Sequence, residues 1–264
     1  MRIDRLSTGQ ALTQNGCGMQ MATASPLAGA WIDAYDGHHP IVDVGCAYGL
    51  AVKEAAARSV PVLAIDCCEE HLEAVRHTCA GLPSFEGARF GRLPDDLSLP
   101  AASASSILVA EVLHFLNGPQ CDRALAALHA TLVPGGLLFV TAQSVEGFLK
   151  VVFPDGNAEA RRVRDGVAKR AAAGERWPGT YVMESEDVDL EQIYSGVLRE
   201  SVGAHLPPEA LRAATPKYEV VHTAQHLRAG AERAGLIVVS AVETSHPGYP
   251  DGADVVQLVA RRPL

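Results

Sequence analysis

A glycine-bearing turn that follows a short apolar run is the part of this sequence best suited to hold a ligand. Residues 41–44 (IVDV) are typical of a buried strand, and the turn after them contains Gly45 and Gly49. Glycine allows a tight backbone turn and lets a ligand approach without a Cβ atom in the way. In open α/β sheets, ligands bind beyond the carboxyl ends of the strands. The turn therefore predicts a binding site, with a purely structural turn as the alternative.

An acidic residue ends the next apolar run. Asp66 closes residues 60–66 (VPVLAID), at the place where an acidic side chain in nucleotide-binding sheets hydrogen-bonds ribose hydroxyls. The alternative role is to cap the following helix, and one side chain can serve both. The dinucleotide fingerprint G-x-G-x-x-G fails, because Ala47 and Leu50 stand where its second and third glycines belong. The pattern thus disfavours a pyrophosphate at the start of that helix.

Two further side chains could take part in proton transfer. Residues 105–111 (SSILVAE) predict a strand with Glu111 at its carboxyl end and His114 in the turn after it. Histidine is the most frequent general base in enzymes. Burying an unpaired carboxylate is costly, which favours Glu111 facing a cavity. The alternative for His114 is packing beside Phe115.

The elements that must position these residues alternate between strand and helix. This alternation predicts an α/β fold with a doubly wound, mostly parallel sheet covered by helices on both faces. The last two strands have no helix between them, so we expect them to pair as an antiparallel hairpin. The predicted strands are 40–44, 60–66, 88–90, 105–111, 137–141, 236–242 and 255–260, and the predicted helices are 50–58, 69–79, 119–132 and 222–234. Residues 134–136 (PGG) are predicted to form a turn before the fifth strand.

Four motifs in this order resemble those of the class I S-adenosylmethionine-dependent methyltransferases. Residues 43–49 (DVGCAYG) are similar to the first motif of that family, Asp/Glu-x-Gly-x-x-x-Gly, and Asp66 looks like its ribose-binding acid. Residues 107–115 (ILVAEVLHF) resemble the family's fourth strand with the turn after it, and residues 132–137 (LVPGGL) resemble the motif before the fifth strand. The resemblance implies a seven-stranded, Rossmann-like sheet, S-adenosylmethionine as cofactor, and methyl transfer as the reaction.

The resemblance also implies a set of cofactor contacts around the first motif and the neighbouring strand ends. One departure is that the segment 91–97 (GRLPDDL) has Leu93 where many members place an acid against the adenine, which leaves that contact to the main chain or to Asp95. The expected cofactor-binding residues are Asp43, Gly45, Cys46, Ala47, Tyr48, Gly49, Asp66, Cys67, Leu93 and Glu111.

Methyl transfer itself depends mainly on positioning the acceptor in line with the reactive methyl group. A base is needed only where the attacking atom carries a proton at neutral pH. The expected catalytic residues are His114 and Glu111.

The regular alternation stops between about residues 142 and 222, over a segment too long for a simple connector. It contains predicted helices at 158–173 and 188–202. We expect a single domain over residues 1–264, in which 143–221 form a helical lid after the fifth strand and 1–38 form a cover over the cofactor. The candidate residues of the substrate lid are Trp177, Tyr181 and His222.

Composition narrows the class of partner. A net charge of −9 gives no general basic field for a phosphate backbone, and the basic stretch 161–176 is typical of a solvated helix face. No apolar run approaches the ~20 residues of a membrane span, and the first residues lack the apolar core of a signal peptide. The six cysteines are scattered, which is typical of reduced thiols rather than of a metal site.

These features favour a cytoplasmic monomer or homodimer that contacts neither membrane nor nucleic acid. We expect it to methylate an O, N or C atom of a small molecule, with specialised metabolism as the setting. Two other classes stay open: a nicotinamide-dependent oxidoreductase on a related dinucleotide fold, and a non-catalytic methyltransferase-like binding module.

Overall fold

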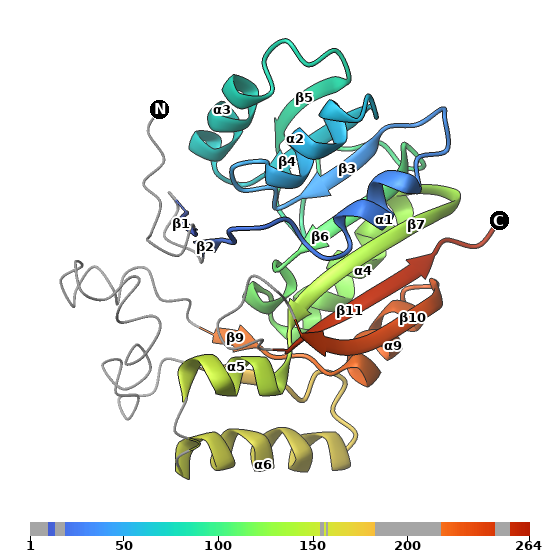
Figure 1. The fold of residues 1–264 in the computed structure, drawn as a ribbon. Coiled ribbons are helices and arrows are strands. Elements are labelled where there is room, and N and C mark those ends of the chain that lie inside the picture. The colour runs from blue at the N-terminus through green and yellow to red at the C-terminus, as the bar shows by residue number, and fades with distance from the viewer. Residues whose placement is uncertain (1–9, 14–18, 154–155, 157, 183–217, 246–253) are drawn as a thin grey trace.

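A computed structural model describes residues 10–13, 19–153, 156, 158–182, 218–245 and 254–264 (Figure 1). Its centre is a seven-stranded sheet in the order β10-β11-β7-β6-β3-β4-β5. The strands are β3 (Ile41–Val44), β4 (Val62–Asp66), β5 (Phe85–Phe90), β6 (Ala104–Ala110), β7 (Leu132–Gln143), β10 (Ile237–Ser245) and β11 (Asp254–Arg261).

The strands from β5 to β7 pair in parallel, whereas β11 pairs antiparallel with both β7 and β10. This arrangement confirms the predicted doubly wound, mostly parallel sheet and its antiparallel hairpin at the end of the chain. Because the chain order reverses between β3 and β6, the crevice for a ligand is expected beyond the carboxyl ends of these two strands.

Helices cover the sheet on both faces, and Figure 1 shows α1 and α2 in front of it with α4 behind. The side chains of each strand alternate between two apolar layers, so that Ile41 packs in one and Val42 in the other. The first layer contains α1 (Ala28–Asp33), α2 (Leu50–Ala57) and α3 (Glu69–Thr78), and the second contains α4 (Gly118–Thr131) and α9 (Ala224–Arg233).

Two local features of α4 and β7 were not predicted. The Asn117 side chain accepts a hydrogen bond from Gln120 N, and the Gln120 side chain accepts one from Asn117 N, which together cap α4. Residues 134–136 (PGG), predicted as a turn before a strand, lie instead within β7. There they form an irregularity between the pairs Ala104–Leu132 and Ser106–Leu137.

The insertion begins with α5 (Val145–Val152) and α6 (Ala158–Ala172), which share a small apolar cluster of their own. The guanidinium of Arg164 on α6 donates two hydrogen bonds of 2.8 Å to the carboxylate of Glu146 on α5. One cation of the basic stretch thus holds two helices together. The strands β8 (Thr180–Val182) and β9 (Tyr218–Val220) pair antiparallel, and the helix predicted at 188–202 lies outside the described residues.

Two short strands near the start of the chain, β1 (Ala11–Leu12) and β2 (Met19–Gln20), pair antiparallel. A single 3-10 turn, Leu113–Phe115, follows β6 and carries His114. None of the described helices is both long and apolar enough to cross a membrane.

Trp177 lies in the core rather than on a surface that could line a substrate pocket. It is 6% exposed, and a Cβ added at Gly118 or Gly230 would lie 2.8 Å from its Cδ1 or 2.6 Å from its Cη2. The Arg233 guanidinium lies 5.4 Å from its ring centroid. The absence of side chains on α4 and α9 at these glycines lets the indole fasten the insertion to both helices.

We expect Trp177→Ala to lower the free energy of unfolding by about 3–5 kcal/mol, because it leaves a cavity between two helices. Urea unfolding followed by circular dichroism measures this value. Phe90→Ala is the control, since Phe90 is 52% exposed and its loss should change stability by less than about 1 kcal/mol. Equal losses for the two variants would contradict this anchoring role.

Candidate functional site

The glycine turn after β3 is held against the end of β4. The Ile65 carbonyl accepts hydrogen bonds from the backbone N–H groups of Gly45, at 2.8 Å, and Cys46, at 3.1 Å. The backbone is left-handed at Gly45 (φ 78°), Ala47 (φ 45°) and Gly49 (φ 73°), a conformation that favours glycine. The turn therefore has the conformation predicted for a close backbone approach to a ligand.

Asp66 connects this turn to the start of α3. Its Oδ2 accepts a hydrogen bond of 2.9 Å from the Ala47 N–H, and its Oδ1 accepts one of 3.0 Å from the Cys68 N–H. His71 Nδ1 lies 3.0 Å from the same Oδ1. Asp66 therefore supports the first residues of α3 and also meets the glycine turn. His71 had not been identified from the sequence, where no pattern connects it with Asp66.

Asp43 is buried close to Asp66. Burial, and secondly the charge of Asp66, raises the pKa of Asp43 to about 7. Two acidic side chains thus lie under one turn, where a cationic ligand would favour the ionised form of Asp43.

The N-terminal strands reach the same turn. Gln20 on β2 accepts a hydrogen bond of 2.9 Å from the Tyr48 N–H through Oε1. The Tyr48 ring packs with Ala11 of β1 and Ala74 of α3, and it meets the His71 ring edge-on with centroids 5.0 Å apart. Gln20 is a second contact that the sequence did not indicate.

The turn after β6 packs directly against the glycine turn. A Cβ added at Gly45 would overlap Cγ2 of Val112. The preceding Glu111 is left-handed at φ 56°, which is uncommon for a residue other than glycine and clusters at functional sites. The predicted catalytic segment therefore begins beside the predicted cofactor turn.

Glu111 and His114 lie together on this turn. His114 Nδ1 lies 3.9 Å from Glu111 Oε2, and the two side chains keep 10% and 14% of their surfaces exposed. The His114 ring also packs on Phe115 with centroids 4.0 Å apart, so the packing alternative is present as well. Burial, with a smaller contribution from His222, lowers the pKa of His114 to about 3.

His222, predicted as part of a lid, lies against this turn and is buried. Its backbone N–H donates a hydrogen bond of 2.9 Å to the Gln143 carbonyl, and its own carbonyl accepts one of 3.2 Å from Val145. Its ring meets the Trp177 ring edge-on at 5.6 Å. Burial lowers the pKa of His222 to about 4, while hydrogen bonding with the Leu113 backbone acts in the opposite direction. The sheet edge thus brings His222 beside His114, although they are far apart in the sequence.

The other residues predicted to contact cofactor or substrate differ in how deeply they are buried. Cys46 and Leu93 are buried, whereas Cys67 is exposed. The Asp95 carboxylate pairs with Arg123 Nη2 at 3.3 Å and is 67% exposed. Tyr181 lies on β8, and the placement of its side chain is outside what the structure describes.

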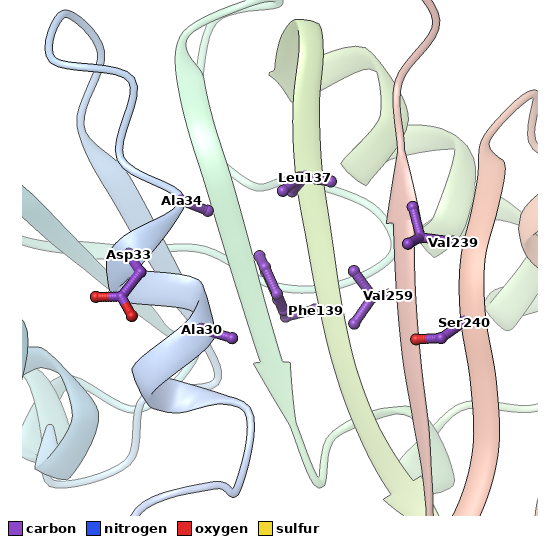
Figure 2. Close-up of a pocket in the computed structure, with 8 residues that line it drawn as sticks. All are labelled: Ala30, Asp33, Ala34, Leu137, Phe139, Val239, Ser240 and Val259. Atoms are coloured by element: carbon purple, nitrogen blue, oxygen red, sulfur yellow. The ribbon is translucent and has the colours of Figure 1, made fainter.

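An apolar hollow of about 470 Å³ lies elsewhere, between α1 and the face of β7, β11 and β10 (Figure 2). Its one charged lining side chain, Asp33, pairs with Arg58. The hollow therefore offers a surface for apolar contact but no base for chemistry. Its lining residues are Ala30, Asp33, Ala34, Leu137, Phe139, Val239, Ser240 and Val259.

Two groups of residues thus meet at the carboxyl ends of β3, β4 and β6. The first joins a left-handed glycine turn to two buried carboxylates, which suits a ligand with hydroxyl groups and positive charge. The second places two imidazoles and a carboxylate beside it, which suits proton transfer. In the described part of the chain, no three His, Cys, Asp or Glu side chains gather as metal ligands.

Comparison with known proteins agrees with this arrangement. Residues 41–136 match a family model described as a methyltransferase domain. No curated protein matches the chain. A S-adenosylmethionine-dependent methyltransferase from Methanosarcina mazei has the same fold, with a TM-score of 0.60 and 16% identity over 92% of this chain and 99% of its own.

Two more solved structures share the fold. One is a S-adenosylmethionine-dependent methyltransferase from Mesorhizobium loti, with a TM-score of 0.56 and 19% identity over 90% of this chain and 96% of its own. The other is a geranyl diphosphate C-methyltransferase from Streptomyces coelicolor, with a TM-score of 0.52 and 11% identity over 89% of this chain and 79% of its own.

Proposed function

We propose that this chain, which carries a class I S-adenosylmethionine-dependent methyltransferase domain, transfers a methyl group to a small-molecule acceptor. The hydrogen bond from the Ala47 N–H to Asp66 Oδ2 is the observation that carries the proposal. It joins the first-motif turn and the acid at the end of β4 into one site, which the alternative of two unrelated features would not require. When bound, S-adenosylmethionine supplies an electrophilic methyl group on a sulfonium sulfur.

The residues at this site fit such a cofactor. A carboxylate offers about four lone-pair positions, so beside its three protein partners Asp66 keeps about one position for a ribose hydroxyl. Asp43 places a second carboxylate where a positive charge would be stabilised. The absence of a Cβ at Gly45 lets the turn pack directly against Val112. The proposed cofactor contacts are Asp43, Gly45, Cys46, Ala47, Tyr48, Gly49, Asp66, Cys67, Leu93 and Glu111.

The acceptor side of the site is proposed to be the turn after β6. His114 is the proposed base and Glu111 its neighbouring carboxylate, which would stabilise the imidazolium formed when His114 takes a proton. Tyr181 and the insertion over residues 143–221 would close this side, and residues 1–38 would cover the cofactor through contacts such as that of Gln20 with Tyr48.

A small organic acceptor is the class that the charge of the chain favours. The net charge of −9 opposes binding to a phosphate backbone, and the geranyl diphosphate C-methyltransferase that shares the fold acts on a small molecule. Reduced cysteines support a cytoplasmic location; five of them are free among the described residues. We place the reaction in specialised metabolism and expect a monomer or homodimer.

Calorimetric titration with S-adenosylhomocysteine tests the cofactor assignment. We expect micromolar binding, weakened at least tenfold in Asp66→Ala and Asp66→Asn, because the ribose loses its charged acceptor. Asp33→Asn is the control, since this acid lies on α1 and pairs with Arg58; its affinity should stay within twofold. Circular dichroism reports whether each variant is folded.

Two outcomes separate the alternatives. Binding of NAD or NADP without binding of S-adenosylhomocysteine would establish the oxidoreductase class and overturn the proposal. Binding of S-adenosylhomocysteine without transfer of radiolabelled methyl groups to any acceptor in a small-molecule extract would favour the non-catalytic module.

A further inference from the structure

Two neighbouring histidines keep ring nitrogens without hydrogen bond partners inside the protein. In the described part of the chain, His114 Nδ1 and both ring nitrogens of His222 are buried and make no hydrogen bond of good geometry, and the Leu113 backbone is a weak partner of the His222 ring. His222 is 1% exposed and His114 is 8% exposed. A buried polar group without a partner destabilises the fold, so packing alone gives no reason to keep two such rings close enough to affect each other's pKa.

The position of His222 is fixed by its surroundings rather than by its own nitrogens. Its backbone is bonded at both ends to the segment after β7, and Trp177 holds one edge of its ring. Trp177 is in turn held between Gly118 and Gly230. The Leu113 backbone reaches one imidazole nitrogen of this well-anchored ring, and the other nitrogen is available to a ligand.

Burial keeps both rings neutral. Three charged or titratable groups lie nearby: Glu111 is 3.9 Å from His114, His226 lowers the pKa of His222, and Arg233 lies over the Trp177 ring. A neutral imidazole has one N–H donor and one acceptor nitrogen. A pair of them therefore matches a ligand group that both donates and accepts a hydrogen bond.

We propose that His222 forms, together with His114, the polar wall that receives the nucleophilic group of the acceptor, and that this group is a hydroxyl or an N–H. The inference rests on the proposed function, which it deepens by naming the chemistry of the accepting atom. A carbon acceptor without such a proton would leave the ring nitrogens that face it without a hydrogen bond partner.

The proposed reaction couples methyl transfer to the loss of one proton from the acceptor. The oxygen or nitrogen of the acceptor forms a bond to the methyl carbon, and the carbon–sulfur bond breaks with its electron pair left on sulfur. The proton of the O–H or N–H passes to the acceptor nitrogen of one imidazole. The positive charge is thus transferred from sulfur to a ring that stands beside the Glu111 carboxylate, which stabilises it.

Nuclear magnetic resonance of the ¹⁵N-histidine-labelled protein, saturated with S-adenosylhomocysteine, tests this wall without knowledge of the natural acceptor. The probes are phenol and anisole, which share a ring but differ in the removable proton. We expect phenol to shift the ring-nitrogen signals of His114 and His222 and to bind at least fivefold more tightly than anisole. In His222→Phe, and in His222→Gln as a polar replacement, this preference should fall to below twofold.

His129→Phe is the matched control because His129 lies on the outer part of α4, and it should keep the full preference. If phenol and anisole bind equally, or if neither shifts the two histidines, the inference is overturned. Failure of S-adenosylhomocysteine to bind the wild-type protein would instead overturn the proposed function, so the two failures are distinguishable.

Discussion

Gly45→Ala is expected to weaken S-adenosylhomocysteine binding about a hundredfold, and to lower the free energy of unfolding by about 3 kcal/mol. Two effects add at this position. The backbone is left-handed at φ 78°, where a residue with a Cβ atom costs roughly 1–2 kcal/mol. The new Cβ would also overlap Val112, so either the turn or the segment leading to Glu111 must move out of place.

Gly81→Ala separates these two effects. Gly81 has nearly the same backbone angle, φ 81°, but no heavy atom lies within 4 Å of an added Cβ. We expect this control to lose only the backbone part, about 1–2 kcal/mol, and to bind S-adenosylhomocysteine within twofold of wild type. Urea unfolding and calorimetric titration measure both quantities for the two variants.

Val112→Ala in the Gly45→Ala background isolates the overlap. Removing both methyl groups of Val112 should restore about half of the lost stability if the clash causes it, and the double-mutant cycle gives this interaction directly. If Gly45→Ala binds as tightly as Gly81→Ala, the turn does not approach the cofactor, and the site would have to be sought elsewhere.

The layers of this fold could be predicted because each strand of the central sheet has a recognisable pattern of residue types. Asp66, Gly45 and the apolar run before each of them follow from strand length, glycine chemistry and the position of strand ends. The sequence likewise indicates helix α6, which the structure places at Ala158–Ala172. These signals depend only on neighbours within a few residues.

The contacts that complete the site have no such signal. His222 meets His114 because the chain returns to the end of β7, where Gln143 binds its backbone, and no local pattern encodes this return. Trp177 was predicted to be a lid residue because an aromatic residue next to Pro178 is typical of a rigid surface turn. The two glycines that receive its ring, Gly118 and Gly230, lie in separate helices. Gln20 reaches Tyr48 for an equally non-local reason.

Residues 134–136 show that residue types alone do not distinguish a turn from an irregular strand. Proline and glycine there do interrupt the ladder between β6 and β7, but the strand resumes in the same direction. A Cβ at Gly136 would lie 2.9 Å from the Ser105 carbonyl oxygen, so this glycine serves a close approach of two strands. The residue types are those of a turn, and only the pairing distinguishes the two.

Acidification from pH 7 to pH 5 is expected to destabilise the protein through His114 and His222. Their ordinary pKa of 6.5 falls to about 3 and about 4 on burial, so the unfolded chain binds more protons than the folded one in this range. Stability is therefore full above about pH 6.5 and falls as the pH drops toward the folded values. Each ring costs about 2 kcal/mol between pH 7 and pH 5.

Asp43 acts in the opposite direction. Its pKa rises from 3.8 to about 7 in the folded protein, so the folded form keeps a proton that the unfolded chain releases. This group stabilises the protein by about 2 kcal/mol as the pH falls from 7 to 5. These three groups together should therefore cost the wild-type protein about 2 kcal/mol. Glu146, whose pKa Arg164 lowers from 4.5, loses its contribution only below this range.

Urea unfolding at pH 7, 6 and 5 then gives a different slope for each of two variants. His222→Phe removes one imidazole and should leave stability nearly constant with pH, whereas Asp43→Asn removes the opposing carboxyl and should double the loss to about 4 kcal/mol. Because the two variants change the slope in opposite directions, a general loss of packing cannot imitate both. Equal slopes in all three proteins would mean that these groups are hydrated in the folded state, and the dry, neutral imidazole pair on which proton acceptance depends would not exist.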